Sequence, residues 1–186
     1  MKLNLEKLEK LAGHLPKGLG HPVIQHLASI RDLFTEGRLE AARRSSDPAV
    51  KREAAAAVVN ACVTLCTAIG TEPIPLADFP ILTSLQVSMV AAVIYISGRT
   101  MSRKIAVEFI AALGTNVGAG LFLREGSRAI LKIFPVWGNA ISGAIAGAGT
   151  YAIGRSATAY FIDGGSIQAA KKLLKGTRPP ALPKSK

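Results

Sequence analysis

The residues best suited to chemistry are three histidines and two cysteines, and neither set has the spacing of a known site. His14, His21 and His26 lie close together, in or beside a Gly/Pro-rich turn. They could ligate a metal, but no Cys or carboxylate stands at a supporting spacing, so we expect surface histidines. Cys62 and Cys66 share one helix face without forming a Cys-x-x-Cys motif, and we expect buried thiols.

Motifs for nucleotide chemistry are absent or incomplete. The sequence contains no G-x-x-x-x-G-K-[ST] phosphate-binding loop. Gly147–Ala152 matches the dinucleotide fingerprint only formally, because it lacks a preceding strand and a suitably placed acidic residue. Asp78 is most simply a helix cap, and Glu108 most simply pairs with Lys104, although an ionisable role inside a membrane is an alternative. We therefore expect no enzyme activity, catalytic residue, cofactor or metal.

Composition limits the kinds of element that could carry a function. The 186 residues include 23 Lys+Arg and 12 Asp+Glu, giving a net charge of +11, and 49% are hydrophobic. This is too apolar for a disordered chain and too poor in Cys for a disulfide scaffold. The basic tail 171–186 contains no aromatic residue, so nucleic acid is an unlikely partner and an anionic membrane is favoured.

Hydrophobic periodicity predicts helices throughout. No convincing alternation of period two occurs, so we expect an all-α, multi-helix bundle with apolar, glycine-rich hairpins, associated with a membrane. Residues 1–47 form amphipathic N-terminal helices in this interpretation, the second running from about Pro22 to Arg44. Asp47 and Pro48 begin an apolar helical domain, 48–165, and residues 166–186 form a basic C-terminal tail.

Two uncharged stretches have the length of membrane spans. Residues 54–71 and 79–98 predict a helical hairpin with Glu72 and Asp78 at its tip. Basic residues flank both open ends, which fits the positive-inside rule with the tip outside. The later stretches fit less well, so we expect two spans, with four shorter ones as the alternative. Polar residues within the stretches would equally suit a soluble bundle.

Basic residues near the apolar segments are candidates for contact with anionic headgroups. They lie in the turn after the second stretch and in the C-terminal tail: Arg99, Arg103, Lys104, Lys171, Lys172 and Lys175.

Glycines spaced by four residues are candidates for close helix packing. Gly143 with Gly147 and Gly114 with Gly118 each remove side chains from one helix face, so that another backbone can approach. Intramolecular packing and formation of a homo-oligomer are both consistent with this pattern.

Two segments resemble a known family. The first begins at Pro73 and ends at Gln86, and its motif residues are Pro73, Pro75, Asp78, Pro80, Thr83 and Gln86. The second runs from Ile133 through the glycine-rich helix to Tyr160. Both resemble the YcjF-like domain, a membrane-associated helical module often linked to Era-like or dynamin-like GTPases. The resemblance covers about residues 50–165 and implies a GTPase supplied by another chain, but it supplies no catalytic residue.

These patterns lead us to expect a non-enzymatic membrane-associated helical adaptor or anchor. The alternatives are an oligomeric pore-forming or membrane-remodelling protein and a soluble helical bundle that binds another protein. No secretory signal is recognisable in Met1–Leu15. We expect a bacterial inner (cytoplasmic) membrane location with cytoplasmic termini, and a cytoplasmic location as the alternative.

Overall fold

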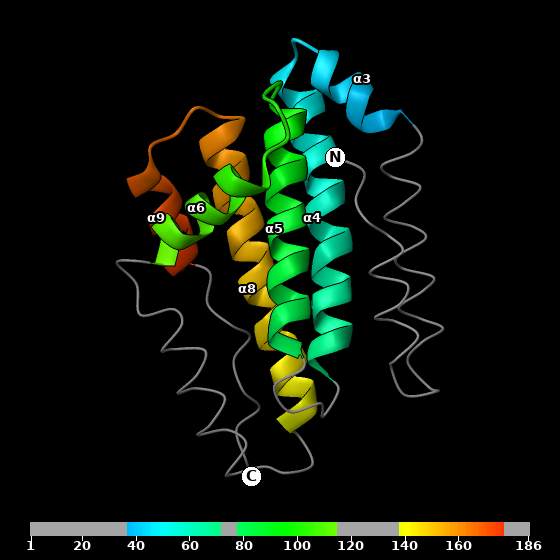
Figure 1. Cartoon of the computed structure of the whole chain (residues 1–186), viewed down its shortest axis with the longest axis vertical. Helices are drawn as coiled ribbons and strands as arrows, with labels where there is room; N and C mark the ends of the chain where they lie inside the picture. The colour runs from blue at the N-terminus through cyan, green and yellow to red at the C-terminus, as the bar shows by residue number, and fades with distance from the viewer. Residues whose placement is uncertain (1–36, 72–77, 115–137, 177–186) are drawn as a thin grey trace.

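The computed structural model describes residues 37–71, 78–114 and 138–176, and all regular structure in these ranges is helical (Figure 1). The described helices are α3 (Arg38–Arg44), α4 (Pro48–Gly70), α5 (Asp78–Ile96), α6 (Arg103–Gly114), α8 (Gly138–Phe161) and α9 (Ile167–Gly176). The all-α class predicted from the sequence is therefore confirmed for the described part of the chain.

The helix starts follow local capping rules. Asp47 caps α4, where its Oδ1 accepts a hydrogen bond from the Ala49 N–H at 2.7 Å, and Pro48 occupies the first turn as predicted. Ser102 Oγ accepts from the Ile105 N–H at 3.2 Å at the start of α6. Ser166 Oγ accepts from the Ala169 N–H at 3.1 Å at the start of α9. Short polar side chains thus cap the N-termini of three helices.

Two glycines with left-handed backbone conformations, Gly37 and Gly164, lie next to helix ends. Gly164, with φ of +70°, follows α8, and the next residue donates its N–H to the Ala159 carbonyl at 2.9 Å. This matches the stop expected at Asp163-Gly-Gly165. Gly37, with φ of +68°, precedes α3. The single helix expected from Pro22 to Arg44 is therefore broken at Gly37, because a left-handed residue cannot continue a right-handed helix. Residues before Gly37 lie outside the described residues.

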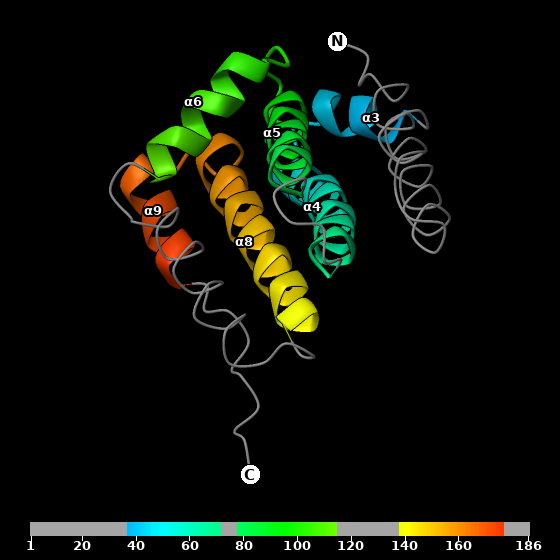
Figure 2. The same cartoon turned by 60° about the horizontal axis from the view of Figure 1, so that its bottom comes forward.

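Helices α4, α5 and α8 lie side by side and form a three-helix bundle (Figures 1 and 2). α4 runs antiparallel to α8: the beginning of α4 meets the end of α8 through Arg52 and Asp163, and the two meet at their other ends through Gly70 and Gly143. α5 returns antiparallel to α4, so it has the direction of α8. Short α3 lies across the end of the bundle where α4 begins. α9 packs against α8, and α6 packs against α5 and α9 (Figure 1).

The core is centred on α5. From Met89 to Ile94, every side chain is at most 2% exposed, so this segment is buried on all faces. α3, α4, α6 and α8 all pack against α5. A helix that is apolar on every side is either a membrane span or the central helix of a bundle, and α5 occupies the second kind of place. Its apolar composition therefore does not by itself require lipid.

One described helix is long and apolar enough to cross a membrane. It is α4, whose best 18-residue window has a mean hydropathy of 1.6. In α5, the segment Leu82–Ile96 is apolar but shorter than a candidate span. By length and composition alone, the described residues thus support one candidate span where the sequence predicts two.

Candidate functional site

Basic side chains from distant parts of the sequence meet at the end of the bundle where α4 begins. Lys51 Nζ donates to the Ser97 carbonyl at 3.4 Å. Arg52 Nε pairs with Asp163 Oδ1 at 2.7 Å. The Arg99 guanidinium lies 5.4 Å from the centre of the Phe161 ring. We call this region the basic end; its Lys and Arg residues are Arg43, Arg44, Lys51, Arg52, Arg99, Arg103 and Lys104.

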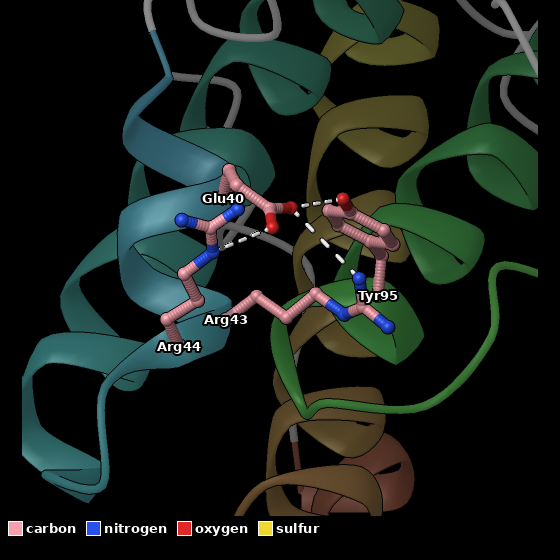
Figure 3. Close-up of polar contacts among 4 residues, drawn as sticks. All are labelled: Glu40, Arg43, Arg44 and Tyr95. Atoms are coloured by element: carbon pink, nitrogen blue, oxygen red, sulfur yellow. Dashed lines mark hydrogen bonds and ion pairs between the residues drawn. The ribbon is translucent and has the colours of Figure 1, made fainter.

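A polar cluster at the basic end fastens α3 to α5 (Figure 3). Glu40 Oε1 accepts a hydrogen bond from Arg44 Nε at 2.9 Å, and Glu40 Oε2 lies 3.9 Å from an Arg43 terminal nitrogen. The Tyr95 hydroxyl donates to Glu40 Oε2, and the Arg43 guanidinium stacks 4.6 Å from the Tyr95 ring centre. The hydrogen bonds from Tyr95 and Arg44 hold the pKa of Glu40 below its usual value.

This cluster was not found by sequence reasoning. Glu40 and Tyr95 stand 55 residues apart, and Tyr95 lies in a long stretch without charged residues. A lone tyrosine near the end of an apolar helix was the one available signal, because its hydroxyl needs a partner when the ring is buried.

The predicted headgroup residues lie on neighbouring elements. Arg99, Arg103 and Lys104 are exposed, as are Lys172 and Lys175 of α9, while Lys171 is half-buried. α6 packs against α9, so the two helices that carry most of these residues are in contact (Figure 2). Lys104 also pairs with Glu108 at 3.9 Å, as the spacing predicted.

Aromatic contacts hold α6 in this position. The Phe109 ring centre lies 5.3 Å from that of Tyr160 and 4.9 Å from that of Phe161. The opposite side of α6 is open: Val107 is 45% exposed and Ile105 is 41% exposed, close to Arg103 and Lys104. An exposed apolar and basic helix face of this kind suits contact with an anionic lipid surface.

Away from the basic end, the bundle carries no charge along three segments that we call the shaft. The shaft consists of residues 54–70 of α4, 82–96 of α5 and 142–154 of α8. Its exposed positions on α4 are small or polar and uncharged, namely Ala56, Ala57, Asn60 and Thr64. Thr64 Oγ1 donates to the Asn60 carbonyl at 3.0 Å, so this exposed hydroxyl is satisfied within its own helix.

One polar contact joins α5 and α8 inside the shaft. Thr150 of α8 is fully buried and donates to the Ala146 carbonyl at 2.9 Å. Gln86 of α5 donates its side-chain N–H to Thr150 Oγ1 at 3.1 Å. The hydrogen-bonding capacity of Thr150 is thereby used, as burial of a hydroxyl requires.

Glycines of α8 face α4 directly. A methyl group added at Gly143 would lie 2.7 Å from the Thr67 carbonyl oxygen, and one at Gly154 would lie 2.6 Å from the Val59 methyl groups. One at Gly147 would collide with the Thr67 side chain. Gly143 and Gly147 thus serve packing within the chain. Gly114 is exposed with no atom near an added methyl group, and Gly118 lies outside the described residues.

The remaining predicted residues are scattered. Asp78 and Pro80 stand in the first turn of α5, Thr83 is exposed, and Pro73 and Pro75 lie outside the described residues, as do the three histidines. Cys62 and Cys66 are buried free thiols, as expected. Within the described ranges, no group of three His, Cys, Asp or Glu side chains could hold a metal ion.

The chain was compared with protein families, curated proteins and solved structures. No protein-family model matches the chain, and neither a curated protein nor a solved structure shows significant similarity to it. The YcjF-like resemblance therefore remains a prediction.

Proposed function

We propose that this protein is a non-enzymatic, membrane-associated helical adaptor or anchor. In this proposal, the uncharged shaft enters the bilayer, and the basic end with α6 and α9 contacts anionic headgroups. The observation that carries the proposal is the separation of charge along the bundle. No Lys, Arg, Asp or Glu occurs in these three segments, although the chain passes through the shaft three times. Arg155, which directly follows Gly154 and whose guanidinium lies 6.0 Å from the Tyr151 ring centre, marks the boundary of the shaft on α8.

The packing of the helices produces this separation. α4 begins where α5 and α8 end, so the charged ends of three separate segments fall together. Lys and Arg at the membrane surface gain about 1 kcal/mol each from anionic lipid. An uncharged segment of 17 residues in α4 is about 25 Å long at 1.5 Å per residue, close to the thickness of a hydrocarbon core.

The test is flotation of the full chain, made by cell-free synthesis with vesicles of anionic or zwitterionic lipid. The double variant R103Q/K104Q should lower binding to anionic vesicles by about 2 kcal/mol, roughly 30-fold. The control is R43Q/R44Q, which removes the same charge from α3 rather than from the exposed apolar and basic face of α6. We expect a smaller loss there. Equal binding of wild type to both lipids, or no flotation, would count against the proposal.

A soluble protein-binding bundle is the second candidate, and the burial of α5 favours it. α5 needs no lipid around it, because protein already covers it on every side. This candidate predicts that the purified chain stays monodisperse without detergent. The partner expected from the family resemblance, a GTPase on another chain, belongs to either candidate and is tested by co-purification from the source cell.

A further inference from the structure

The close packing of α8 along α4 determines whether the two helices could enter a bilayer separately. α4 and α8 are in contact along the shaft, from Gly70 against Gly143 at one end to Val59 against Gly154 towards the other. The close approach leaves no room for lipid between them, because even a methyl group at these glycines would overlap α4. α8 therefore cannot remain outside a bilayer that α4 enters, unless this interface opens.

The central polar contact strengthens this link. Gln86 of α5 and Thr150 of α8 are hydrogen-bonded inside the shaft, at 3.1 Å. Separating α8 from α5 within lipid would leave the Gln86 amide without its acceptor in a hydrocarbon medium that offers none, while Thr150 would keep its bond to Ala146. The three shaft helices are thus expected to enter the bilayer as one unit.

We infer that α4, α5 and α8 are embedded together, with lipid acyl chains as the partner of their outer surface. Consequently, the beginning of α8 lies on the same side of the membrane as the beginning of α5, opposite the basic end. This inference rests on the proposed function and goes beyond it, because the two-span hairpin expected from the sequence places only α4 and α5 across the bilayer. Three of the described helices then lie in the bilayer, one more than the two-span hairpin provides.

Two properties of the shaft surface favour lipid as its partner: it lacks charged residues, and the exposed hydroxyl group of Thr64 is hydrogen-bonded within its own helix. The described shaft residues include no Lys, Arg, Asp or Glu, and the contacts of Lys51 with Ser97 and of Arg52 with Asp163 lie at the basic end; Arg155, over the Tyr151 ring, borders the shaft on α8. The exposed hydroxyl of Thr64 donates to the Asn60 carbonyl of its own helix at 3.0 Å. Such bonds allow a threonine to face lipid without an unmet donor.

Single-cysteine accessibility tests the inference on the full chain in bacterial spheroplasts and in inverted vesicles. A membrane-impermeant maleimide is applied to Asp78→Cys at the start of α5, Asn139→Cys at the start of α8, Glu53→Cys in α4 and Glu108→Cys in α6. The wild-type chain is the blank, because Cys62 and Cys66 are only 4% and 0% exposed. If Asn139→Cys fails to accumulate, Gly138→Cys reports on the same end.

The expected result is that Asp78→Cys and Asn139→Cys react from one side, and Glu53→Cys and Glu108→Cys from the other. If Asn139→Cys reacts from the same side as Glu108→Cys while Asp78→Cys reacts from the opposite side, the inference is overturned and membrane anchoring by the hairpin survives. Reaction of all four from one side overturns the inference as well. Release of the wild-type chain by alkaline carbonate overturns insertion itself, and so separates failure of the proposed function from failure of the topology.

Discussion

Glycine at three positions of α8 sets how closely that helix can approach α4. At Gly143, an added methyl group would lie 2.7 Å from a backbone oxygen of α4, which no side-chain rotation can relieve. Gly149 lies in the same helix, yet nothing is within 4 Å of a methyl group added there. The two positions form a matched pair, because they share helix and residue type but differ in their surroundings.

Gly143→Ala should therefore destabilise the fold by about 1–3 kcal/mol through overpacking, and Gly149→Ala should stabilise it by up to about 1 kcal/mol through helix propensity. The measurement is the thermal unfolding midpoint of each purified variant. Equal shifts in the same direction would show that α8 does not lie against α4 through Gly143.

Because the Glu40 carboxylate can be protonated, we expect the attachment of α3 to α5 to depend on pH. Hydrogen bonds from Tyr95 and Arg44 lower the pKa of Glu40 in the folded chain. A lowered folded-state pKa means that this contribution is present above the unfolded pKa of about 4.5 and is lost as the pH falls through the folded value. Amide hydrogen exchange in α3 should accordingly become faster under strongly acidic conditions.

Substitution separates this contact from general acid unfolding. Glu40→Gln removes the titrating group, so exchange in α3 should be faster at neutral pH and should change less on acidification. Tyr95→Phe removes the main donor, and α3 should then loosen nearer pH 4.5. An unchanged acid response in both variants would assign the effect to another group.

The position of α6 depends on contacts with residues that lie far away in the sequence. Phe109 is 4% exposed and packs on the rings of Tyr160 and Phe161. Phe109→Ala should cost about 3–5 kcal/mol at this junction and free α6 from the bundle.

Because α6 carries Arg103 and Lys104, freeing it should also alter binding to anionic vesicles, although Phe109→Ala changes no charge. Vesicle flotation and hydrogen exchange in α6 measure the two effects together. Ala111→Ser, at an exposed position of the same helix, is the control and should change neither. Faster exchange with unaltered vesicle binding would separate the fixed position of α6 from lipid recognition.

Local features of the elements were predictable from the sequence because they depend on neighbouring residues. The Asp47-Pro48 helix start, the stop around Gly164 and the pairing of Lys104 with Glu108 all follow from short spacings. Contacts between distant residues were not predictable in this way. Nothing near Glu40 indicates Tyr95, and nothing near Arg52 indicates Asp163, because these pairs exist only once the helices pack.

The packing of the bundle explains why hydropathy along the chain does not by itself identify a membrane span. An uncharged stretch such as that of α5 has the composition of a membrane span, but the fold covers it with four other helices. Composition cannot distinguish burial by lipid from burial by protein, since both remove apolar surface from water. The glycine pattern was similarly open between association with another copy and packing within the chain, and at Gly143 and Gly147 the neighbour is α4.

Extraction with alkaline carbonate tests whether the chain is anchored in a membrane. Cells expressing the tagged full chain are fractionated, and the membranes are washed at high pH to strip proteins held only by charge. The proposal predicts that the chain remains in the membrane pellet after the wash. Recovery in the soluble fraction before any wash would contradict it and would leave the soluble protein-binding bundle as the account of this fold.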